Sequence, residues 1–250
     1  YDENGVLVHS GTNTYTTPVL SSSAKYEVFT GLAASNNTSA VIGTGSSTST
    51  ESTPFSNMKS NKLQLIYLAD ELKQAGFSRG VIRNISFKSG NTLGTAVRNG
   101  FTIHMGLTTL EEYSTDSAGN SKFIPTDRLS LVKQSATQSL VGSSDNLFTL
   151  DNAFVWDGES NLVVQFTYAN PAGTKPAATN FEVNNFSGIQ KYRALYAGDD
   201  LSTLTAMNNL AIGRKSYYRV KPTIQFLDGC FSSNNKVSVN YTQAPNLVLS

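Results

Sequence analysis

Apolar and polar residues alternate along much of the chain. In residues 101–107 apolar side chains occupy every second position, and Thr102, His104 and Gly106 lie between them. This period of two predicts a β-strand with one face on a core and the other, including His104, facing solvent. The alternation recurs in residues 162–168 and 237–241, and similar short runs occur at residues 6–9, 26–29, 63–68, 81–88, 148–150, 194–197 and 217–226.

About a dozen short strands, separated by turns rich in Gly, Asn and Ser, predict an all-β fold, an antiparallel sandwich of jelly-roll type. One helix is expected at residues 69–75, where Leu68, Leu72 and Ala75 share a face and Gly76 can end the helix. A single short helix does not fit alternating strands and helices, so a parallel nucleotide-binding sheet is not expected.

Two polar stretches predict the boundaries of this sandwich. Residues 35–56 are almost entirely Ser, Thr, Asn, Gly and Ala, and a second polar stretch lies near residues 228–235. Such stretches are typical of linkers. We therefore expect three parts: a short β segment at 1–34, the jelly-roll sandwich at 35–229 and a closing β segment at 230–250.

Composition excludes several classes of partner. Nineteen Lys and Arg balance eighteen Asp and Glu, which gives a formal net charge of +1. Nucleic acid and membrane partners are not expected, because no excess of basic charge is present and no apolar run reaches the length of about 18 residues that a membrane span needs. Charged residues are 15% of the chain, against roughly 25% in an average soluble domain. This composition is typical of extracellular β proteins.

The single cysteine, Cys230, excludes an internal disulfide and a multi-cysteine zinc site, but it can still pair with another chain. No signal sequence opens the chain. We expect an export signal to lie outside this sequence, and the chain to be a fragment or a processed product.

Several segments together resemble the jelly-roll repeat of large surface proteins that gliding-type bacteria export through the type IX secretion system. The similar segments are residues 40–55, 64–72, 80–87, 101–109, 154–164 and 219–226. Residues 1–28 are similar to the second half of a bacterial immunoglobulin-like repeat, and residues 236–242 to its closing strand. The resemblance covers nearly the whole chain. It implies a jelly roll inserted into a partial immunoglobulin-like domain, just ahead of the last strand of that domain.

A partial sandwich leaves backbone groups unpaired at its edge and exposes apolar side chains, so something must complete it. The missing strands lie either in a longer polypeptide or in a neighbouring copy that donates a strand. Residues 246–250 form a short apolar tail suited to donation, and a head-to-tail contact that does not close produces a filament. The expected function is a structural or adhesive surface module, a filament protomer or stalk repeat with itself as partner. The expected assembly residues are Val237, Val239, Tyr241, Leu247 and Leu249.

Asp116-Ser117-Ala118 resembles the acceptor of O-linked glycosylation in proteins that these bacteria export. It lies in a stretch rich in Ser, Gly and Asn, where a glycan on Ser117 would stand clear of the fold. The expected location is extracellular, at the cell surface.

Catalytic chemistry is not expected. His9 and His104 both lie in strand patterns without motif partners, and no metalloprotease, nucleophile-elbow or phosphate-loop motif occurs. The carboxylate pairs at residues 111–112 and 199–200 fit solvated loops better than the facing acids of a glycosidase. No cofactor is expected, although oxygens of Asp145, Asp151, Asp157 and Glu159 could hold a structural Ca²⁺.

Carbohydrate binding is the alternative function. Jelly-roll modules can bind surface glycans through exposed aromatic rings, and Trp156 and Tyr196 are the candidates, with Tyr192, Tyr217 and Tyr218 nearby in the sequence. Trp156 fits core packing or turn cover better than ligand stacking, and tyrosines are common in ordinary strands.

Overall fold

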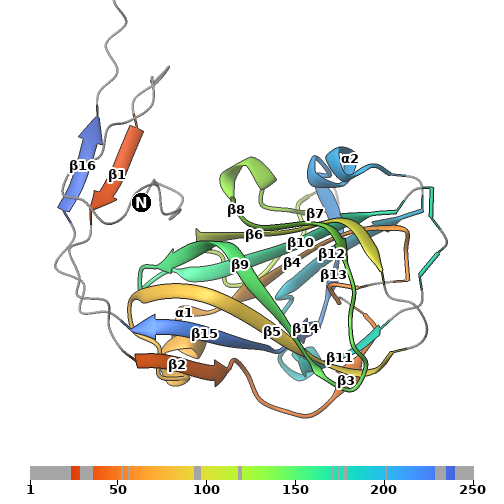
Figure 1. Ribbon diagram of the computed structural model, residues 1–250, viewed down its shortest axis with the longest axis horizontal. Helices are drawn as coiled ribbons and strands as arrows, with labels where there is room; N and C mark the ends of the chain where they lie inside the picture. Colours follow the sequence, from red (N-terminus) through yellow and green to blue (C-terminus); the bar gives the residue numbers. More distant parts are fainter. Residues whose placement is uncertain are drawn as a thin grey trace, which may run out of the picture.

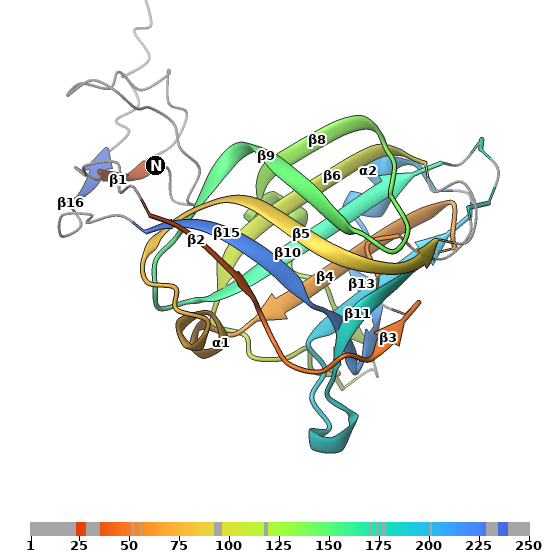
Figure 2. The ribbon, with the colours of Figure 1, turned by 60° about the horizontal axis from the view of Figure 1, so that its bottom comes forward.

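Most of the alternating segments lie in two antiparallel sheets of seven strands each in a computed structural model of the protein (Figure 1). The structure describes residues 24–28, 36–51, 53–55, 57–92, 97–117, 120–170, 172–173, 175–176, 179–200, 202–228 and 235–239. The fold is therefore all-β, an antiparallel sandwich whose two layers are seen face to face in Figure 2.

Sheet I has β10 at its centre, paired with β4 on one side and β6 on the other. Its strands, in spatial order, are β7 (Ser121–Lys122), β13 (Ile212–Ser216), β12 (Ala194–Asp199), β4 (Ser60–Tyr67), β10 (Asn161–Ala169), β6 (Arg98–Thr108) and β8 (Ser130–Gln138).

Sheet II is built around β5, the longest strand. Its main path is β14 (Tyr218–Val220), β11 (Thr179–Asn185), β5 (Gly80–Thr92), β15 (Pro222–Asp228) and β2 (Asn36–Val41), with β3 (Thr48–Ser49) paired to β11 and β9 (Asp145–Trp156) paired to β5. Every strand of the two large sheets comes from residues 36–228. The first and last of these strands are neighbours, and Asn36 lies opposite Asp228. The chain therefore enters and leaves the sandwich at adjacent points.

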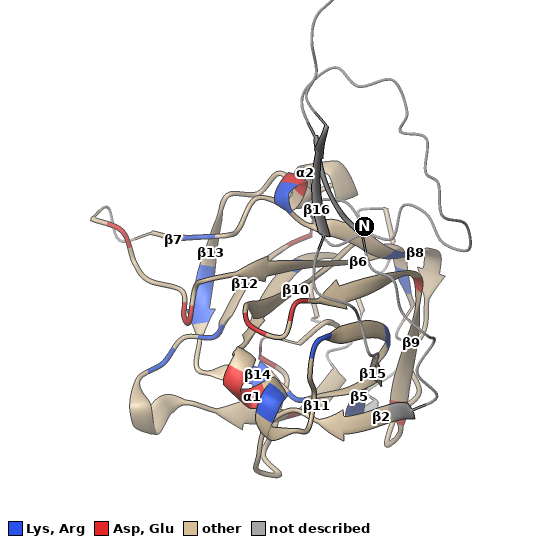
Figure 3. Cartoon of the chain, turned by 90° about the vertical axis from the view of Figure 1, so that its left-hand side faces the viewer, with Lys and Arg blue, Asp and Glu red and all other residues tan. Residues whose placement is uncertain are grey.

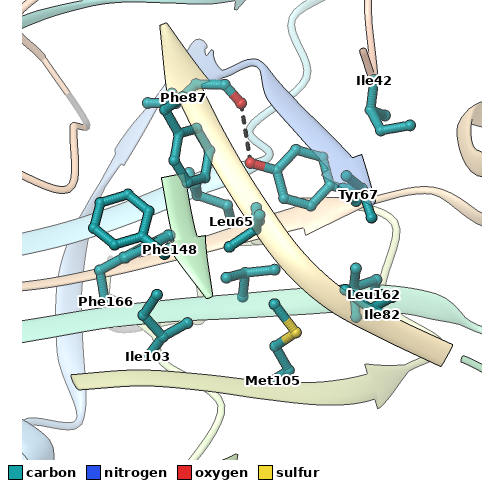
Figure 4. Close-up of a cluster of buried hydrophobic side chains, with 14 of the residues drawn as sticks. Ile42, Leu65, Tyr67, Ile82, Phe87, Ile103, Met105, Phe148, Leu162 and Phe166 are labelled. Atoms are coloured by element: carbon teal, nitrogen blue, oxygen red, sulfur yellow. Dashed lines mark hydrogen bonds between the residues drawn. The ribbon is translucent and has the colours of Figure 1, made fainter. Parts of the chain in front are cut away.

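The main core lies between the sheets and is rich in phenylalanine. Phe87 of β5 packs edge-on against Phe166 of β10 with ring centroids 5.3 Å apart, and Phe101 stacks on Phe148 at 5.4 Å. Figure 4 shows these layers meeting, with Leu65, Ile103 and Met105 from sheet I pointing toward Phe87 and Phe148 of sheet II. The inward-facing residues of each strand pattern are thus the core residues, as the alternation predicts.

The outer face of sheet I is also buried, contrary to the expectation for a half-buried sheet. His104 is only 8% exposed, so its predicted exposure is wrong. Residues between β6 and β8 and the short helix α2 (Leu204–Asn208) lie over this face and bond to its side chains. Lys62 Nζ donates hydrogen bonds to Thr126 Oγ1 (3.2 Å) and to the carbonyls of Asn208 (2.8 Å) and Leu210 (3.0 Å). A second, polar layer therefore lies on the far side of sheet I.

Helix α1 (Ala69–Gln74) confirms the predicted helix. Gly76 follows it with φ +90°, a left-handed conformation that glycine adopts without strain, so the predicted stop signal is also confirmed. Glu71 attaches the helix to the sandwich, because Arg219 donates two 2.7 Å hydrogen bonds to its carboxylate. The remaining helical pieces are α2, which the sequence pattern does not predict, and the single 3₁₀ turns η1 (Thr126–Arg128) and η2 (Ser187–Ile189).

Charge is spread over the described parts of the fold without a large patch of one sign. Figure 3 shows short basic and acidic segments interspersed among the elements, in keeping with the formal net charge of +1. No helix within the described residues is long and apolar enough to cross a membrane.

Candidate functional site

A third sheet has two strands in the part of the chain that the structure describes. β1 (Ala24–Val28) pairs antiparallel with β16 (Asn235–Val239), outside the two large sheets (Figure 1). Of the predicted assembly residues, Val237 lies opposite Tyr26 and Val239 opposite Ala24. Tyr241, Leu247 and Leu249 lie outside the described residues. A two-stranded sheet is only marginally stable by itself in water, so β1 and β16 need further strands or a packed face.

A cavity of about 520 Å³ lies at the side of the sandwich. Its lining comes from Asn61 of β4, residues 196–198 of β12, residues 212–214 of β13 and the segment of residues 50–58 between β3 and β4, here called the rim segment. We call this space the rim cavity. Tyr196 and Arg214 are direct partners in the β12–β13 pair, so their side chains share one face of sheet I.

The rim segment is held in place by its own apolar residue. Phe55 is fully buried and lies against Phe101 at 5.4 Å and Tyr168 at 6.3 Å between ring centroids. Glu51 and Asn57, on either side of this anchor, remain exposed and line the cavity. Packing of Phe55 in the core therefore determines where Glu51 and Asn57 lie.

Small and flexible residues also shape the cavity. A Cβ atom at Gly198 would come within 2.5 Å of Cγ of Met58, so Met58 can pack against β12 only because residue 198 has no side chain. Met58 and Ile212 add apolar surface to the cavity, and Ile212 is 46% exposed. The cavity thus combines apolar and polar walls.

Tyr196 lies between charges of opposite sign. Burial raises the pKa of its hydroxyl, the negative charge of Glu51 raises it further, and the positive charge of Arg214 opposes both effects. The phenol is therefore protonated at neutral pH and can both donate and accept a hydrogen bond. No described residue bonds the side-chain polar groups of Glu51, Asn57, Tyr196 or Arg214.

The two aromatic candidates for glycan binding, Trp156 and Tyr196, lie in different environments. Trp156 is fully buried, packs against Phe226 with ring centroids 6.3 Å apart and donates from Nε1 to the carbonyl of Ser160 at 2.7 Å. It is a core residue and offers no face to a ligand. Tyr196 lines the rim cavity, and its hydroxyl is available to bond to a ligand.

Tyr192 and Tyr217 form a separate pair. Their rings stack at 4.4 Å, their hydroxyl oxygens are 2.6 Å apart, and Tyr217 also donates to Oε1 of Gln190 at 2.6 Å. Lys215 Nζ lies 4.1 Å from the centre of the Tyr192 ring. This cluster is satisfied by its own contacts. Tyr218 is half-buried and packs against the core.

The acidic residues that were candidates for Ca²⁺ do not converge. Asp145 and Asp151 are six residues apart on β9, a separation of roughly 20 Å along a strand. Asp151 accepts from the backbone of Gln134, and Asp157 accepts from the backbone of Glu159 (2.9 Å) and Ser160 (2.8 Å) in its own turn. The described residues contain no group of three or more His, Cys, Asp or Glu side chains placed to hold a metal ion.

The adjacent carboxylate pairs also have local partners. Glu112 pairs with Lys191 at 2.5 Å, and hydrogen bonding to Lys191 lowers the pKa of this carboxyl. Asp199 accepts from the Ser202 hydroxyl at 2.7 Å, and Asp200 accepts from the backbone N–H of Lys59 at 2.9 Å. Asp199 thus stabilises its own turn, whereas Glu112 and Asp200 connect loops to residues far along the chain.

Ser117 lies in an exposed turn. Asp116 and Asn120 close the turn with two backbone N–H bonds, and Asp116 also pairs with Lys122 at 3.2 Å. The Ser117 side chain is exposed, so a modifying enzyme can reach it.

Sequence reasoning missed most of the rim cavity. Glu51 and Asn57 lie six residues apart in the rim segment, but Arg214 lies more than 150 residues further along the chain and meets them only after the sheets pair, so the three form no motif. Tyr196 is the one residue of the cavity that the sequence indicates as a candidate, through its aromatic ring.

The sequence matches no known protein family profile, and no curated protein matches it. Among solved structures, the chain is similar to the cysteine protease and lectin-like domains of Cwp84, a surface layer associated protein of Clostridium difficile. The two are 5% identical with a TM-score of 0.38, and the match covers 68% of this chain and 33% of the other. The chain thus spans about a third of the length of that structure. A likeness at this level carries no argument about function.

Proposed function

We propose that this chain is a structural or adhesive module of an extracellular bacterial surface protein, a filament protomer or stalk repeat that assembles head-to-tail by β-strand complementation. The observation that carries the proposal is the β1–β16 pair, in which a strand ahead of the sandwich pairs with a strand behind it. The adjacent entry and exit points at Asn36 and Asp228 allow this arrangement. Insertion of one domain into another requires adjacent entry and exit points of this kind.

Within the described residues, β1 and β16 pair with each other and with no third strand. A two-stranded antiparallel sheet has a free backbone edge on both sides, and unpaired edges favour addition of another strand. Val237 and Val239 alternate with polar residues in the sequence, a pattern that favours one apolar face for the added structure to cover. Strand addition from another copy, or from a longer polypeptide, satisfies both requirements.

The apolar tail at residues 246–250 is the segment we propose to be donated. It contains Leu247 and Leu249 at a spacing of two, which places both side chains on one face of an extended strand. Donation from one copy to the next is a heterologous contact, and repetition of that contact gives an open filament instead of a closed ring. The partner of this protein is then a second copy of itself.

An extracellular location is supported by the low proportion of charged residues and by the resemblance to exported surface repeats. We also propose O-glycosylation of Ser117, supported by its exposed turn. Carbohydrate binding remains the alternative function, and of its aromatic candidates only Tyr196 lies in a cavity.

Negative-stain electron microscopy tests the assembly proposal. Native material is compared with a chain cut after Tyr241 and with a full-length variant carrying Leu247→Asn and Leu249→Asn. Filaments in the native sample and separate particles in both variants are expected. Separate particles in all three samples, from material shown to be folded by circular dichroism, would contradict strand donation by the tail.

A further inference from the structure

We propose that the rim cavity is a binding site for a neutral saccharide, with Tyr196 as its stacking surface and Glu51, Asn57 and Arg214 as its hydrogen-bonding groups. The site is distinct from β1 and β16, so the inference does not depend on assembly through these strands. It assigns a ligand class to one place on the sandwich.

The size and position of the cavity fit a small ligand. Its volume of about 520 Å³ falls within the roughly 300–1,000 Å³ of typical ligand sites. The walls come from two strands of sheet I and from the rim segment, which Phe55 anchors in the main core. The cavity is therefore largely formed before a ligand arrives, which reduces the entropy lost on binding.

Apolar surface in the cavity suits the C–H faces of a sugar ring. Tyr196 packs against the main core and is only half-buried. Met58 and Ile212 extend the apolar wall on either side. A pyranose has an apolar face that an aromatic side chain can cover, with its hydroxyls pointing outward to polar groups.

The polar groups suit those hydroxyls. A hydroxyl both donates and accepts, so it can bond to a carboxylate, an amide and a guanidinium in the same site. Glu51 supplies acceptors, Arg214 supplies donors and Asn57 supplies both, and none of the three is engaged by another described side chain. They can bind a ligand without first breaking a contact within the described fold.

The charge balance selects a neutral ligand. The cavity contains one carboxylate, from Glu51, and one guanidinium, from Arg214, and both act on the hydroxyl of Tyr196 with opposite sign. An acidic sugar would be attracted by Arg214 and repelled by Glu51. A neutral saccharide uses both groups as hydrogen-bond partners.

Other polar clusters of the sandwich fit a ligand less well. The layer around Lys62 is closed, since Lys62 Nζ already has three acceptors and lies 4.7 Å from the centre of the Phe123 ring. Tyr192 and Tyr217 bond to each other. The rim cavity, by contrast, combines open space with free polar side chains and an aromatic ring.

Saccharide binding can be tested on the full chain with an array of neutral and acidic oligosaccharides, followed by saturation-transfer difference NMR with the neutral glycans retained. We expect binding to neutral glycans that falls at least tenfold in Tyr196→Ala. Arg214→Gln and Glu51→Gln, at exposed positions where loss of folding is not expected, should each weaken binding several-fold. Tyr192→Ala is the matched control, because it removes a half-buried tyrosine outside the cavity, and it should bind as the unmodified chain does.

Three outcomes would overturn the proposal. The first is no neutral glycan detected by either method at millimolar concentration. The second is retention of acidic glycans only. The third is binding that Arg214→Gln and Glu51→Gln leave unchanged while Tyr192→Ala removes it. Because the readout is glycan binding and not assembly, it is separate from the filament assay, and either proposal can fail while the other holds.

Discussion

His104 is a buried histidine that carries no partner on Nδ1 among the described residues. Burial lowers the pKa of its imidazole, and the nearby positive charge of Lys62 lowers it further, to about 4 from the ordinary value of 6.5. The ring is therefore neutral in the folded protein at neutral pH. Protonation would place a second positive charge in the polar layer on the outer face of sheet I, beside Lys62.

This burial predicts an acid sensitivity. Between pH 6.5 and pH 4 the unfolded chain binds a proton at His104 that the folded chain does not, so the free energy of unfolding falls as pH falls through this window. The full loss is roughly 3 kcal/mol, at about 1.4 kcal/mol for each unit of pKa difference. Urea unfolding at a series of pH values should show a shallower decline for His104→Gln. Parallel curves for the two proteins would contradict a neutral buried His104.

The strands show what local patterns can and cannot predict. Alternation finds β6 and β10 and assigns Phe101, Ile103 and Phe166 to the core, because the side-chain period of two is a local property. Alternation does not predict that the outer face of sheet I is buried. Gln165 and His104 read as solvent-facing, yet both are buried, since residues far along the chain cover them. Cover of this kind is a tertiary property and leaves no period in the sequence.

The helix α1 offers the sharpest element-scale prediction. Gly76 has φ +90°, and a Cβ atom there would meet nothing within 4 Å. Gly76→Ala therefore changes only the backbone strain and should cost about 1 kcal/mol of unfolding free energy. Gly188→Ala is the control, because that position is also open but has no positive φ, and it should be neutral or slightly stabilising. Equal effects of the two substitutions in chemical denaturation would count against a left-handed stop at Gly76.

The whole molecule is a sandwich held between two strands that pair with each other. Its first and last strands are neighbours in sheet II, and the flanking strands pair again with Val28 opposite Asn235. Sequence patterns predict the individual strands but not the pairing of β1 with β16. No short-range pattern connects residue 24 to residue 239. The candidate cavity is non-local in the same sense, since Glu51 and Arg214 meet only when the sheets are formed.

Cysteine cross-linking tests the terminal pairing directly. In a Cys230→Ser background, Lys25→Cys with Ser238→Cys places the two thiols on directly opposed residues of β1 and β16. Opposed residues in antiparallel strands have Cα atoms about 4.5–5.5 Å apart, within the range that a disulfide spans. Mild oxidation should therefore close the bond in most molecules. Lys25→Cys with Val237→Cys puts the side chains on opposite faces and should stay reduced, as mass spectrometry after thiol labelling would show.

The size of the cross-linked product separates two forms of the same pairing. A disulfide within one chain leaves a monomer on a denaturing gel and means that each copy closes its own β1–β16 pair, leaving the free edges of that pair for a donated strand. A disulfide between chains gives a covalent dimer. It means that β16 itself is exchanged between copies and that the tail beyond it is donated to the same neighbouring copy. Failure to cross-link in either form, with the control also reduced, would remove the pairing on which the proposed mode of assembly rests.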